Sequence, residues 1–315
     1  MKTAATPVSS GYRRMSPGKK KFLDSRYLLI LVLPCILYLV LFNYVPIWGI
    51  SISFMDYKPF LGVSGSTWVG AKHYIRFFTE LNSWKLVRNT FLLSAYSLII
   101  SFPFTIFLAL VVNEVRVDWT KKAFQTVSYM PHFISTVVIV GMLKSMLNPD
   151  SGLLMDFMNL FGFPRADVFT YPRYFRSLYI FSGIWQEAGW GAIIYYAALA
   201  AIDQELYEAA VIDGAGKLQQ ITHITLPCIA PTIVTLFVLR TGSLLSVGFE
   251  KAYLMQTTSN LVTSDVISTY VYRQGLAGSQ FSYSTAVGLF NSLINLLFVV
   301  AANFVSRKLT DYSLW

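Results

Sequence analysis

Long apolar runs separated by short polar segments dominate this chain of 315 residues. A helix that crosses a lipid bilayer needs about 20 mostly apolar residues. The runs predict spans at Leu28–Ile52, Val87–Val112, Phe133–Leu147, Leu178–Ile202, Ile229–Val247 and Ser284–Val305, of which the third is the shortest. The pattern therefore predicts an all-α polytopic membrane protein with six transmembrane helices. A basic N-terminal tail over residues 1–26 precedes a membrane domain over residues 27–315.

The composition agrees with this class. Hydrophobic residues make up 55% of the chain and charged residues 13%, which is about half the charged share of a soluble domain. The first apolar run is longer than the core of a signal peptide and has no A-x-A cleavage site, so we expect an uncleaved first span. Cys35 and Cys228 lie in or beside apolar runs, and two such cysteines predict neither a disulfide framework nor a metal site.

Basic residues predict the orientation of the spans. Six spans place both termini on one face, together with the polar loop over residues 203–227. That face carries 13 lysines and arginines, seven of them in the N-terminal tail, and the opposite face carries 10. Because the flank of the first span usually weighs most in the positive-inside rule, we expect both termini in the cytoplasm. The external loops keep a net charge of +3, which favours an acidic partner or contact with lipid headgroups.

The polar loop, "DQELYEAAVIDGAGKLQQITHITLP", is longer than a connection between two spans requires. Asp203 is the expected N-cap of a short helix. Gly214 and Gly216 follow where that helix should stop, since glycine adopts left-handed dihedral angles without strain. A second short helix is expected next, ending at Pro227. Residues 203–227, called the knob below, are therefore predicted to form a rigid docking element.

The knob resembles the EAA loop of bacterial ABC importer permeases, in which E-A-A is followed by glycine six positions after the glutamate and then by I-x-L-P. Ile221 departs from the phenylalanine of many members but remains apolar. The stretches "WVGAKHYIRFF", "YMPHFISTVVIVGM", "IWQEAGWGAIIYYAAL", "VGFEKAYLM" and "SRKLTDYSLW" resemble the polysaccharide-type branch of carbohydrate importer permeases, and within it the first membrane subunit of bacterial alginate importers. The positions that match the EAA loop are Glu208, Ala209, Ala210, Asp213, Gly214, Ala215, Ile224, Leu226 and Pro227.

This resemblance implies a type I ABC importer permease fold in the bacterial inner membrane. It implies transport of an oligosaccharide or polysaccharide of an acidic, alginate-like kind. The implied partners are a second and different permease subunit, two ATPase subunits, an extracytoplasmic substrate-binding protein and membrane lipid, with no nucleic acid. In the family, the loop is a coupling helix that sits in a groove of the ATPase, which here assigns that role to Glu208, Ala209, Ala210, Asp213, Gly214 and Ala215.

Signatures of catalysis are absent from the sequence. No G-x-x-x-x-G-K-[ST] occurs, so this chain is not expected to hydrolyse ATP. ATP and Mg²⁺ are expected on the partner ATPase, and no cofactor is expected in this chain. H-E-x-x-H, G-x-S-x-G and C-x-x-C are also absent, and His73, His132 and His223 show no ligand spacing. The chain is therefore expected not to be an enzyme.

Apart from Arg88, which is the second residue of its span and is counted with the external face, the charged residues inside the predicted spans are Lys144, Glu187 and Arg240. Such residues are costly in lipid and usually mark a transport pathway or an ion pair. Lys144 lies near the end of its span, where its side chain can reach the interface. Glu187 and Arg240 lie roughly 10–15 Å deep at about 1.5 Å per residue. Either they neutralise each other, or Arg240 faces the cavity and binds an anionic substrate; both hold if Glu187 orients Arg240.

Further polar and aromatic residues accompany these charges. Trp185, Gln186 and Trp190 suit a sugar pathway, because aromatic faces stack on sugar rings and amides bind hydroxyls. An interfacial aromatic belt or helix packing is the alternative. Asn291 and Asn295 lie four apart, on one face of the sixth span. They either form hydrogen bonds across helices or line a polar cavity.

Two classes of transporter compete. The knob predicts the permease of an ATP-driven importer, and the alternative is a secondary sugar transporter that needs no ATPase. Proton-coupled carriers place several carboxylates in their spans, whereas the predicted spans here contain one, Glu187. We therefore expect an importer permease.

Overall fold

The computed structural model describes residues 26–243, 245 and 247–309. The predicted basic tail therefore lies outside the described residues, except for Arg26. The chain divides into two compact units, Met1–Ser51 and Ile52–Trp315. The first unit contains helix α2 (Arg26–Leu39), the π-helical turn η1 (Val40–Tyr44) and most of the 3-10 segment η2 (Val45–Phe54). Its large apolar side chains are exposed, as expected of a segment that faces lipid.

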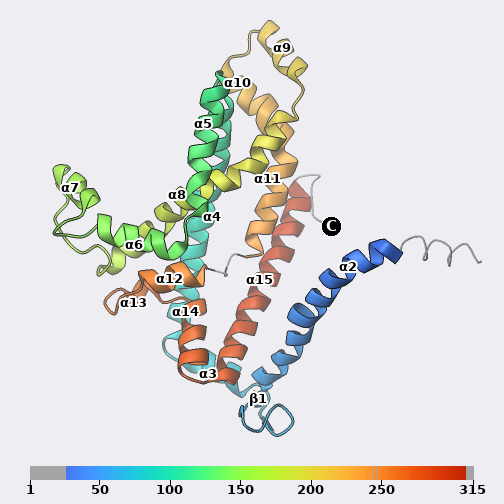
Figure 1. The fold of residues 1–315 in the computed structure, drawn as a ribbon, viewed down its shortest axis with the longest axis vertical. Coiled ribbons are helices and arrows are strands. Elements are labelled where there is room, and N and C mark those ends of the chain that lie inside the picture. The colour runs from blue at the N-terminus through green and yellow to red at the C-terminus, as the bar shows by residue number, and fades with distance from the viewer. Residues whose placement is uncertain (1–25, 244, 246, 310–315) are drawn as a thin grey trace, which may run out of the picture. The chain divides into compact units, whose positions relative to one another are not determined.

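The second unit is built around four helices: α4 (Ser83–Asn113), α8 (Pro172–Ala200), α11 (Leu226–Thr241) and α15 (Phe281–Leu309). Within this unit, α9 (Gln204–Ile212) lies at one end and α3 (Lys72–Thr79) at the other (Figure 1). Two short antiparallel strands, β1 (Met55–Asp56) and β2 (Thr67–Trp68), pair with Met55 opposite Trp68. The remaining elements are α5 (Asp118–Tyr129), η3 (Met130–Phe133), α6 (Thr136–Met146), α7 (Leu153–Leu160), α10 (Lys217–Gln220), η4 (Ile221–Thr225), α12 (Phe249–Met255), α13 (Leu261–Ser264), α14 (Ile267–Tyr272) and η5 (Arg273–Ala277).

Four of the predicted spans are confirmed as helices that are long and apolar enough to cross a membrane: Ile30–Phe54, Ser83–Asn113, Lys217–Thr241 and Phe281–Lys308. A fifth is counted when a bent pair of helices is taken as one span. The fourth predicted span falls in α8, which has 29 residues. This helix is long enough to cross a membrane, but it is not among the helices that are also apolar enough. Gln186 and Glu187 are two of its polar residues. The structure thus confirms the all-helical membrane class, but the count of six spans is not confirmed.

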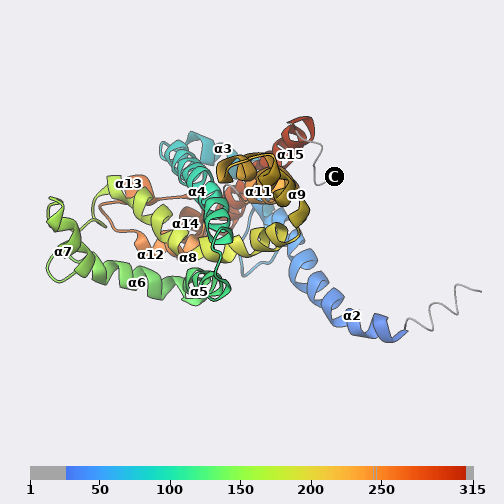
Figure 2. The ribbon, with the colours of Figure 1, turned by 90° about the horizontal axis from the view of Figure 1, so that it is seen from above.

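The third predicted span, Phe133–Leu147, is broken in the structure. Asp118–Phe133 and Thr136–Met146 meet at an angle of 99°, and Figure 2 shows α6 turning away from α5 toward α7. Between the two helices the backbone is extended at Ile134 and Ser135, with ψ of 130° and 147°. Ser135 then caps α6, because its hydroxyl accepts from the backbone N–H of Val138 at 3.4 Å. The third predicted span therefore corresponds to the 11-residue helix α6, which is not long enough to cross a membrane by itself.

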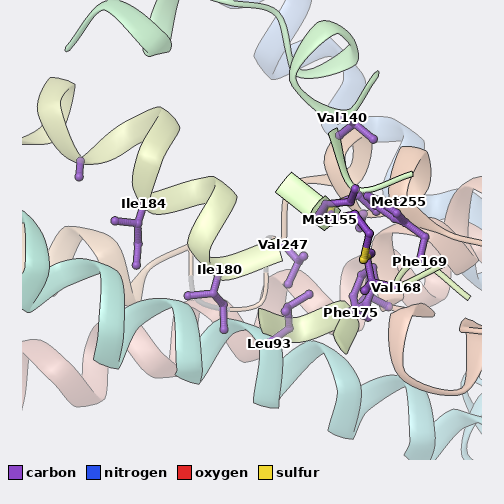
Figure 3. Close-up of a cluster of buried hydrophobic side chains, with 14 residues drawn as sticks. Leu93, Val140, Met155, Val168, Phe169, Phe175, Ile180, Ile184, Val247 and Met255 are labelled. Atoms are coloured by element: carbon purple, nitrogen blue, oxygen red, sulfur yellow. The ribbon is translucent and has the colours of Figure 1, made fainter. Parts of the chain in front are cut away.

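A buried apolar cluster fixes α12 against α8 (Figure 3). Ile180 and Ile184 enter it from α8, and Leu93 enters it from α4. Ala252 and Met255 of α12 are fully buried. Burying a large aliphatic side chain stabilises a fold by roughly 1.5–3 kcal/mol, so this cluster fixes the backbone of α12 beside the middle of α8.

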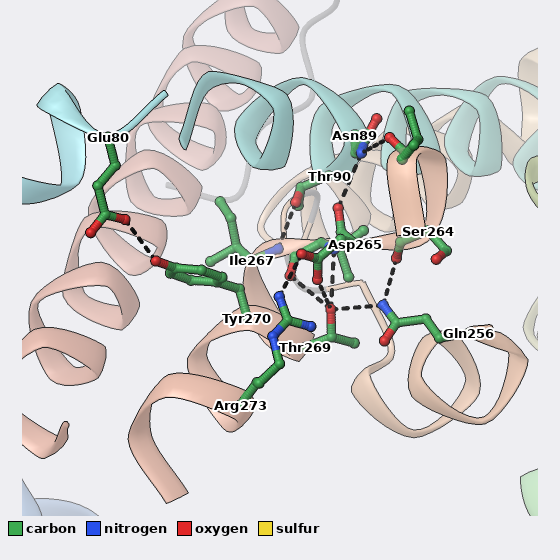
Figure 4. A network of polar contacts seen from close by, with 12 residues as sticks. Glu80, Asn89, Thr90, Gln256, Ser264, Asp265, Ile267, Thr269, Tyr270 and Arg273 are labelled. Atoms are coloured by element: carbon green, nitrogen blue, oxygen red, sulfur yellow. Dashed lines mark hydrogen bonds and ion pairs between the residues drawn. The ribbon is translucent and has the colours of Figure 1, made fainter. Parts of the chain in front are cut away.

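Polar contacts attach the segment after α12 to α4 (Figure 4). The amide of Asn89 donates to the carbonyls of Val262 and Asp265 at 2.9 and 3.2 Å. The hydroxyl of Thr90 accepts from the backbone N–H of Ile267 at 2.9 Å. These bonds satisfy backbone groups that α13 and α14 are too short to satisfy internally. The segment that follows α12 is therefore held against α4.

Candidate functional site

The knob begins with the predicted helix cap. The carboxylate of Asp203 accepts a hydrogen bond from the backbone N–H of Glu205 at 3.0 Å, and α9 starts at the next residue, Gln204. Such a cap satisfies one of the four N–H groups that lack a partner at a helix start. The predicted N-cap is confirmed.

The end of α9 is a Schellman turn built on Gly214. The N–H of Ala215 donates to the carbonyl of Ala210 at 2.8 Å, and the N–H of Gly214 donates to the carbonyl of Val211 at 3.1 Å. Gly214 has φ of +77°, the left-handed conformation that glycine adopts without a Cβ penalty. The expected helix stop at this glycine is confirmed.

The predicted end of the second knob helix at Pro227 is wrong. Lys217–Thr241 runs as one helical segment through the proline. Pro227 lies in the first turn of α11, directly after the π-helical turn η4, Ile221–Thr225. A proline is tolerated there because the wider turn accommodates its missing N–H. The knob therefore passes directly into α11, with no break between them.

Apolar side chains of the knob point into solvent. Ile212 is 85% exposed and Leu218 is 74% exposed, and Leu206 and Val211 of the same segment are exposed as well. Several exposed apolar side chains on one segment are typical of an interaction site. The hydroxyls of Tyr207 and Thr225 lie 2.9 Å apart, and Lys217 forms a 3.0 Å ion pair with Glu114 at the end of α4. The predicted coupling residues Glu208, Ala209, Ala210, Asp213, Gly214 and Ala215 all lie on this surface segment.

A cavity of about 540 Å³ lies between α4, α8, α11 and α12. This volume is within the usual range for small-molecule sites, roughly 300–1,000 Å³. Serines and aliphatic side chains form much of the wall, including Ser94, Ser97 and Ser101 of α4. The charged residues that line it are Glu187, Arg240, Glu250 and Lys251.

Glu187 pairs with a histidine. Its Oε2 lies 3.0 Å from Nδ1 of His132, which belongs to η3. Arg240 forms no ion pair within the part of the chain that the structure describes. The interpretation in which Glu187 and Arg240 neutralise each other is therefore wrong for this conformation, because the break between α5 and α6 brings His132 to Glu187. Arg240 is exposed and lines the cavity.

The other predicted pathway residues of α8 take different places. Gln186 is buried and lines the cavity, and its amide donates to the carbonyl of Ile134 at 3.3 Å. Trp185 is half-exposed and does not line this cavity. Trp190 stacks on His132, with ring centroids 4.4 Å apart and planes 4° apart. Trp190 therefore contacts the histidine of the His132–Glu187 pair and does not line the cavity.

Asn291 and Asn295 bond across helices to one backbone position. Oδ1 of Asn295 accepts from the N–H of Leu245 at 2.7 Å, and the amide of Asn291 donates to the Leu245 carbonyl at 3.4 Å. Neither asparagine lines the cavity. Of the two alternatives open from the sequence, the structure supports hydrogen bonding across helices, which holds the segment after α11 against α15.

Two residues of this region, His132 and Lys251, were not predicted from the sequence. His132 has no spacing that links it to Glu187, because the two are 55 positions apart. Lys251 follows the fifth predicted span, which ends at Val247, and is one of the 10 basic residues predicted on the external face, but it is buried in α12 and faces the cavity. Lys144, expected to reach the interface, instead donates to the carbonyl of Leu254 in α12 at 2.8 Å. The stretch "VGFEKAYLM" was the available signal, because it places Glu250 and Lys251 between apolar residues.

Residues 101–311 match the family of binding-protein-dependent transport system inner membrane components. This chain belongs to that family. The match covers α8, the knob, the cavity helices α11 and α12, and α15. The chain is therefore a membrane permease subunit of an ABC transporter and is not an enzyme. The alternative of a secondary transporter is wrong.

The chain is also similar to permease proteins of Bacillus subtilis. The chain is 46% identical over 295 residues to the polygalacturonan/rhamnogalacturonan transport system permease protein YteP of Bacillus subtilis (strain 168), covering 94% of this chain and 92% of that one. It is 39% identical over 290 residues to protein LplB of the same organism, covering 92% and 91%.

Two solved structures have the same fold. A chain of a bacterial ABC transporter involved in the import of the acidic polysaccharide alginate superposes with a TM-score of 0.86 at 40% identity, covering 94% of this chain and all of that one. A second structure, of the bacterial alginate ABC transporter in complex with an alginate pentasaccharide-bound periplasmic protein, gives 0.85 at 39%, covering 94% and 99%. The type I permease fold and the resemblance to alginate importer subunits are confirmed.

Proposed function

We propose that this chain is the permease subunit through which an ATP-driven importer moves acidic oligosaccharides, made of uronate units, from a periplasmic binding protein into the cytoplasm. The observation that supports an acidic substrate is that one charged residue of the cavity has an ion-pair partner and another has none. Glu187 is engaged by His132, whereas Arg240 has no ion-pair partner among the described residues. A guanidinium exposed to a cavity forms two parallel hydrogen bonds with a carboxylate. The names of the relatives, which concern polygalacturonan and alginate, support the same class of substrate.

The knob supports coupling to an ATPase. Its backbone is fixed by a cap and a Schellman turn, and it exposes Ile212 and Leu218. A rigid apolar projection suits a groove on a soluble partner. We propose that two ATPase subunits, which carry ATP and Mg²⁺, push on this knob and on that of a second, different permease chain. The cavity then opens alternately to each side of the membrane.

The orientation follows from the same proposal. The knob and both termini lie in the cytoplasm, and α7 lies outside. Ala215→Cys should be labelled by a membrane-impermeant maleimide only from the cytoplasmic side, and Leu160→Cys only from the opposite side. Cys35 and Cys228 are exposed and must first be replaced by serine. The reverse labelling pattern would refute the orientation and the docking role of the knob.

The substrate is tested with the complete complex in proteoliposomes. We expect ATP-dependent uptake of trigalacturonate or an alginate trisaccharide that is at least about tenfold faster than uptake of the neutral methyl esters, because a charged hydrogen bond contributes about 1.5–3 kcal/mol. The ester keeps the length and ring shape of the acid and removes its charge. Equal uptake of acid and ester would contradict an acidic substrate.

A further inference from the structure

Lys251 is a buried cation without a hydrogen-bond partner. Its residue is 8% exposed, and its ammonium donates to no acceptor within the described part of the chain. A buried charge that is not hydrogen-bonded is strongly unfavourable, and proteins normally pair such groups. Lys251 nevertheless lines the cavity that also contains Arg240. An ammonium at the wall of a cavity that lacks a hydrogen-bond acceptor can bind an anion there.

The ammonium lies along one face of α8. Its Nζ is 5.3 Å from the ring centroid of Tyr179, and a Cβ placed on Gly183 would lie 3.5 Å from it. Glu187 is the next residue along this face, since positions four apart are neighbours on a helix. The absence of a side chain at Gly183 leaves room for the ammonium between the tyrosine and the glutamate.

Glu187 compensates the ammonium only from a distance. Its carboxylate is within 3.0 Å of His132, and Lys251 forms no ion pair within the described residues. Burial lowers the pKa of Lys251 from its ordinary 10.5 to about 8, although the charge of Glu187 opposes that change. At neutral pH the group therefore still carries a proton, and it lacks an acceptor.

The backbone prevents Lys251 from withdrawing into water. Its neighbour Ala252 and, one turn later, Met255 are fully buried in the cluster with α8. Lys144 donates to the carbonyl of Leu254, in the last turn of the same helix, at 2.8 Å. Because α12 is fixed from both sides, the ammonium stays at the cavity wall.

We propose that Lys251 binds a carboxylate of the transported sugar and selects acidic over neutral oligosaccharides, together with Arg240 on α11. This inference rests on the proposed function and adds a specificity-determining residue that lies outside the predicted spans. A carboxylate of the substrate would accept the hydrogen bond for which the Lys251 ammonium has no acceptor among the described residues. A charged hydrogen bond of this kind corresponds to roughly 10- to 100-fold in affinity.

The competing interpretation is structural: Lys251 anchors α12 on Tyr179 by a cation–π contact. The two interpretations differ in the sign of a stability change. If Lys251 is an anchor, Lys251→Met lowers Tm. If it is an uncompensated cation, Lys251→Met leaves Tm unchanged or raises it, because an apolar side chain of similar length removes the cost of burying the charge. Lys144→Met is the matched control, because it removes a lysine that contacts α12 without lining the cavity.

The decisive experiment is equilibrium dialysis with the purified complex, without the binding protein, using radiolabelled trigalacturonate and its methyl ester. We expect Lys251→Met to weaken binding of the acid about 10- to 100-fold and to change binding of the ester less than about threefold. Lys251→Gln should behave in the same way, and Lys144→Met should preserve the preference for the acid. If the wild type prefers the acid and Lys251→Met keeps that preference, or loses acid and ester equally, the site is overturned and the proposed function stands. A wild type that binds and imports no acidic oligosaccharide overturns both.

Discussion

The contacts that shape the knob join residues close together in the sequence, whereas the contacts that shape the cavity join residues far apart in the sequence. In the knob, every bond that shapes the backbone turn joins residues within five positions of each other, from Asp203 and Glu205 to Ala210 and Ala215. In the cavity, Glu187 finds its partner 55 positions away, in His132. A docking surface of this kind can therefore be recognised from a short stretch of sequence. The charges that meet a substrate depend on how the helices pack.

The largest effect is expected from a change in the backbone turn of the knob. Gly214→Pro fixes φ near −65° and removes the N–H that bonds to Val211, whereas the native φ is +77°. We expect substrate-stimulated ATP hydrolysis by the assembled complex to fall below about one hundredth of the wild-type rate, since the strain of about 3 kcal/mol or more exceeds what this short turn can absorb.

The matched control is Gly216→Ala. Gly216 has φ of −72°, which any residue adopts, and an added Cβ would meet only the side chain of Gln219, at 3.7 Å. Hydrolysis should stay within about twofold of wild type, because a substitution that fits the backbone costs little. If both variants hydrolyse ATP normally, the knob does not couple to the ATPase.

The second test concerns Arg240. We expect Arg240→Ala to slow uptake of trigalacturonate about 10- to 100-fold, because a charged hydrogen bond of about 1.5–3 kcal/mol is lost. The methyl ester should be affected much less. Arg240→Lys should lie between the two, since an ammonium cannot reproduce the fork of a guanidinium. Initial uptake rates measure these differences.

The structure adds a control to this test, because Glu187 pairs with His132. Glu187→Gln should therefore not rescue Arg240→Gln. A double variant that folds and transports the acid normally would show that the two residues only neutralise each other.

The third effect is a dependence on pH, smaller than the loss of Arg240. With a pKa of about 8, Lys251 loses its proton between pH 7 and pH 9. Binding of trigalacturonate should weaken about tenfold over that interval, while Lys251→Met should show no such change. The groups that line the cavity near it are Tyr179, Glu187, Arg240 and Glu250, and His132 holds Glu187.

Stability should change in the opposite sense. Between pH 8 and about 10.5, the unfolded chain still binds the proton that the folded chain has released, so this group makes stability rise with pH. Weaker binding together with a constant or higher Tm therefore separates the titration of Lys251 from alkaline unfolding. Binding that stays constant from pH 7 to pH 9 would remove Lys251 from the substrate site.

The smallest expected effect lies on the surface of the knob. Lys217 and Glu114 form an ion pair that is largely exposed, and exposed pairs contribute about 0–1 kcal/mol. Lys217→Met should change the coupled rate of ATP hydrolysis less than about twofold. A loss comparable to that of Gly214→Pro would show that this side chain, and not the backbone turn, carries the coupling.

Much of the fold was predictable because its determinants are local. Apolar runs located the four confirmed spans, and Asp203 and Gly214 gave the ends of α9. The failures are equally specific. Pro227 looked like a helix stop, but the preceding π-helical turn carries the helix through it. The third apolar run gave no sign of the 99° bend.

The sequence predicted the charged residues of the cavity only in part, because their partners come from distant helices. An ionisable residue inside an apolar run is visible in the sequence, so Glu187 and Arg240 were found. Their partners are set by tertiary contacts between distant helices, so His132 was missed. Lys251 lies after the fifth predicted span, and only the packing of Ala252 and Met255 in the core shows that it is buried.

The most direct test of the account is the ratio of oligosaccharide imported to ATP hydrolysed, measured in proteoliposomes for Arg240→Ala and Gly214→Pro side by side, with binding protein loaded with trigalacturonate. We predict that Arg240→Ala still hydrolyses ATP but imports less acid for each ATP, because its knob is intact and its cavity has lost a cation. Gly214→Pro should lose hydrolysis and import together. A normal ratio in Arg240→Ala, or undiminished hydrolysis in Gly214→Pro, would contradict the assignment of substrate selection to the cavity and of coupling to the knob.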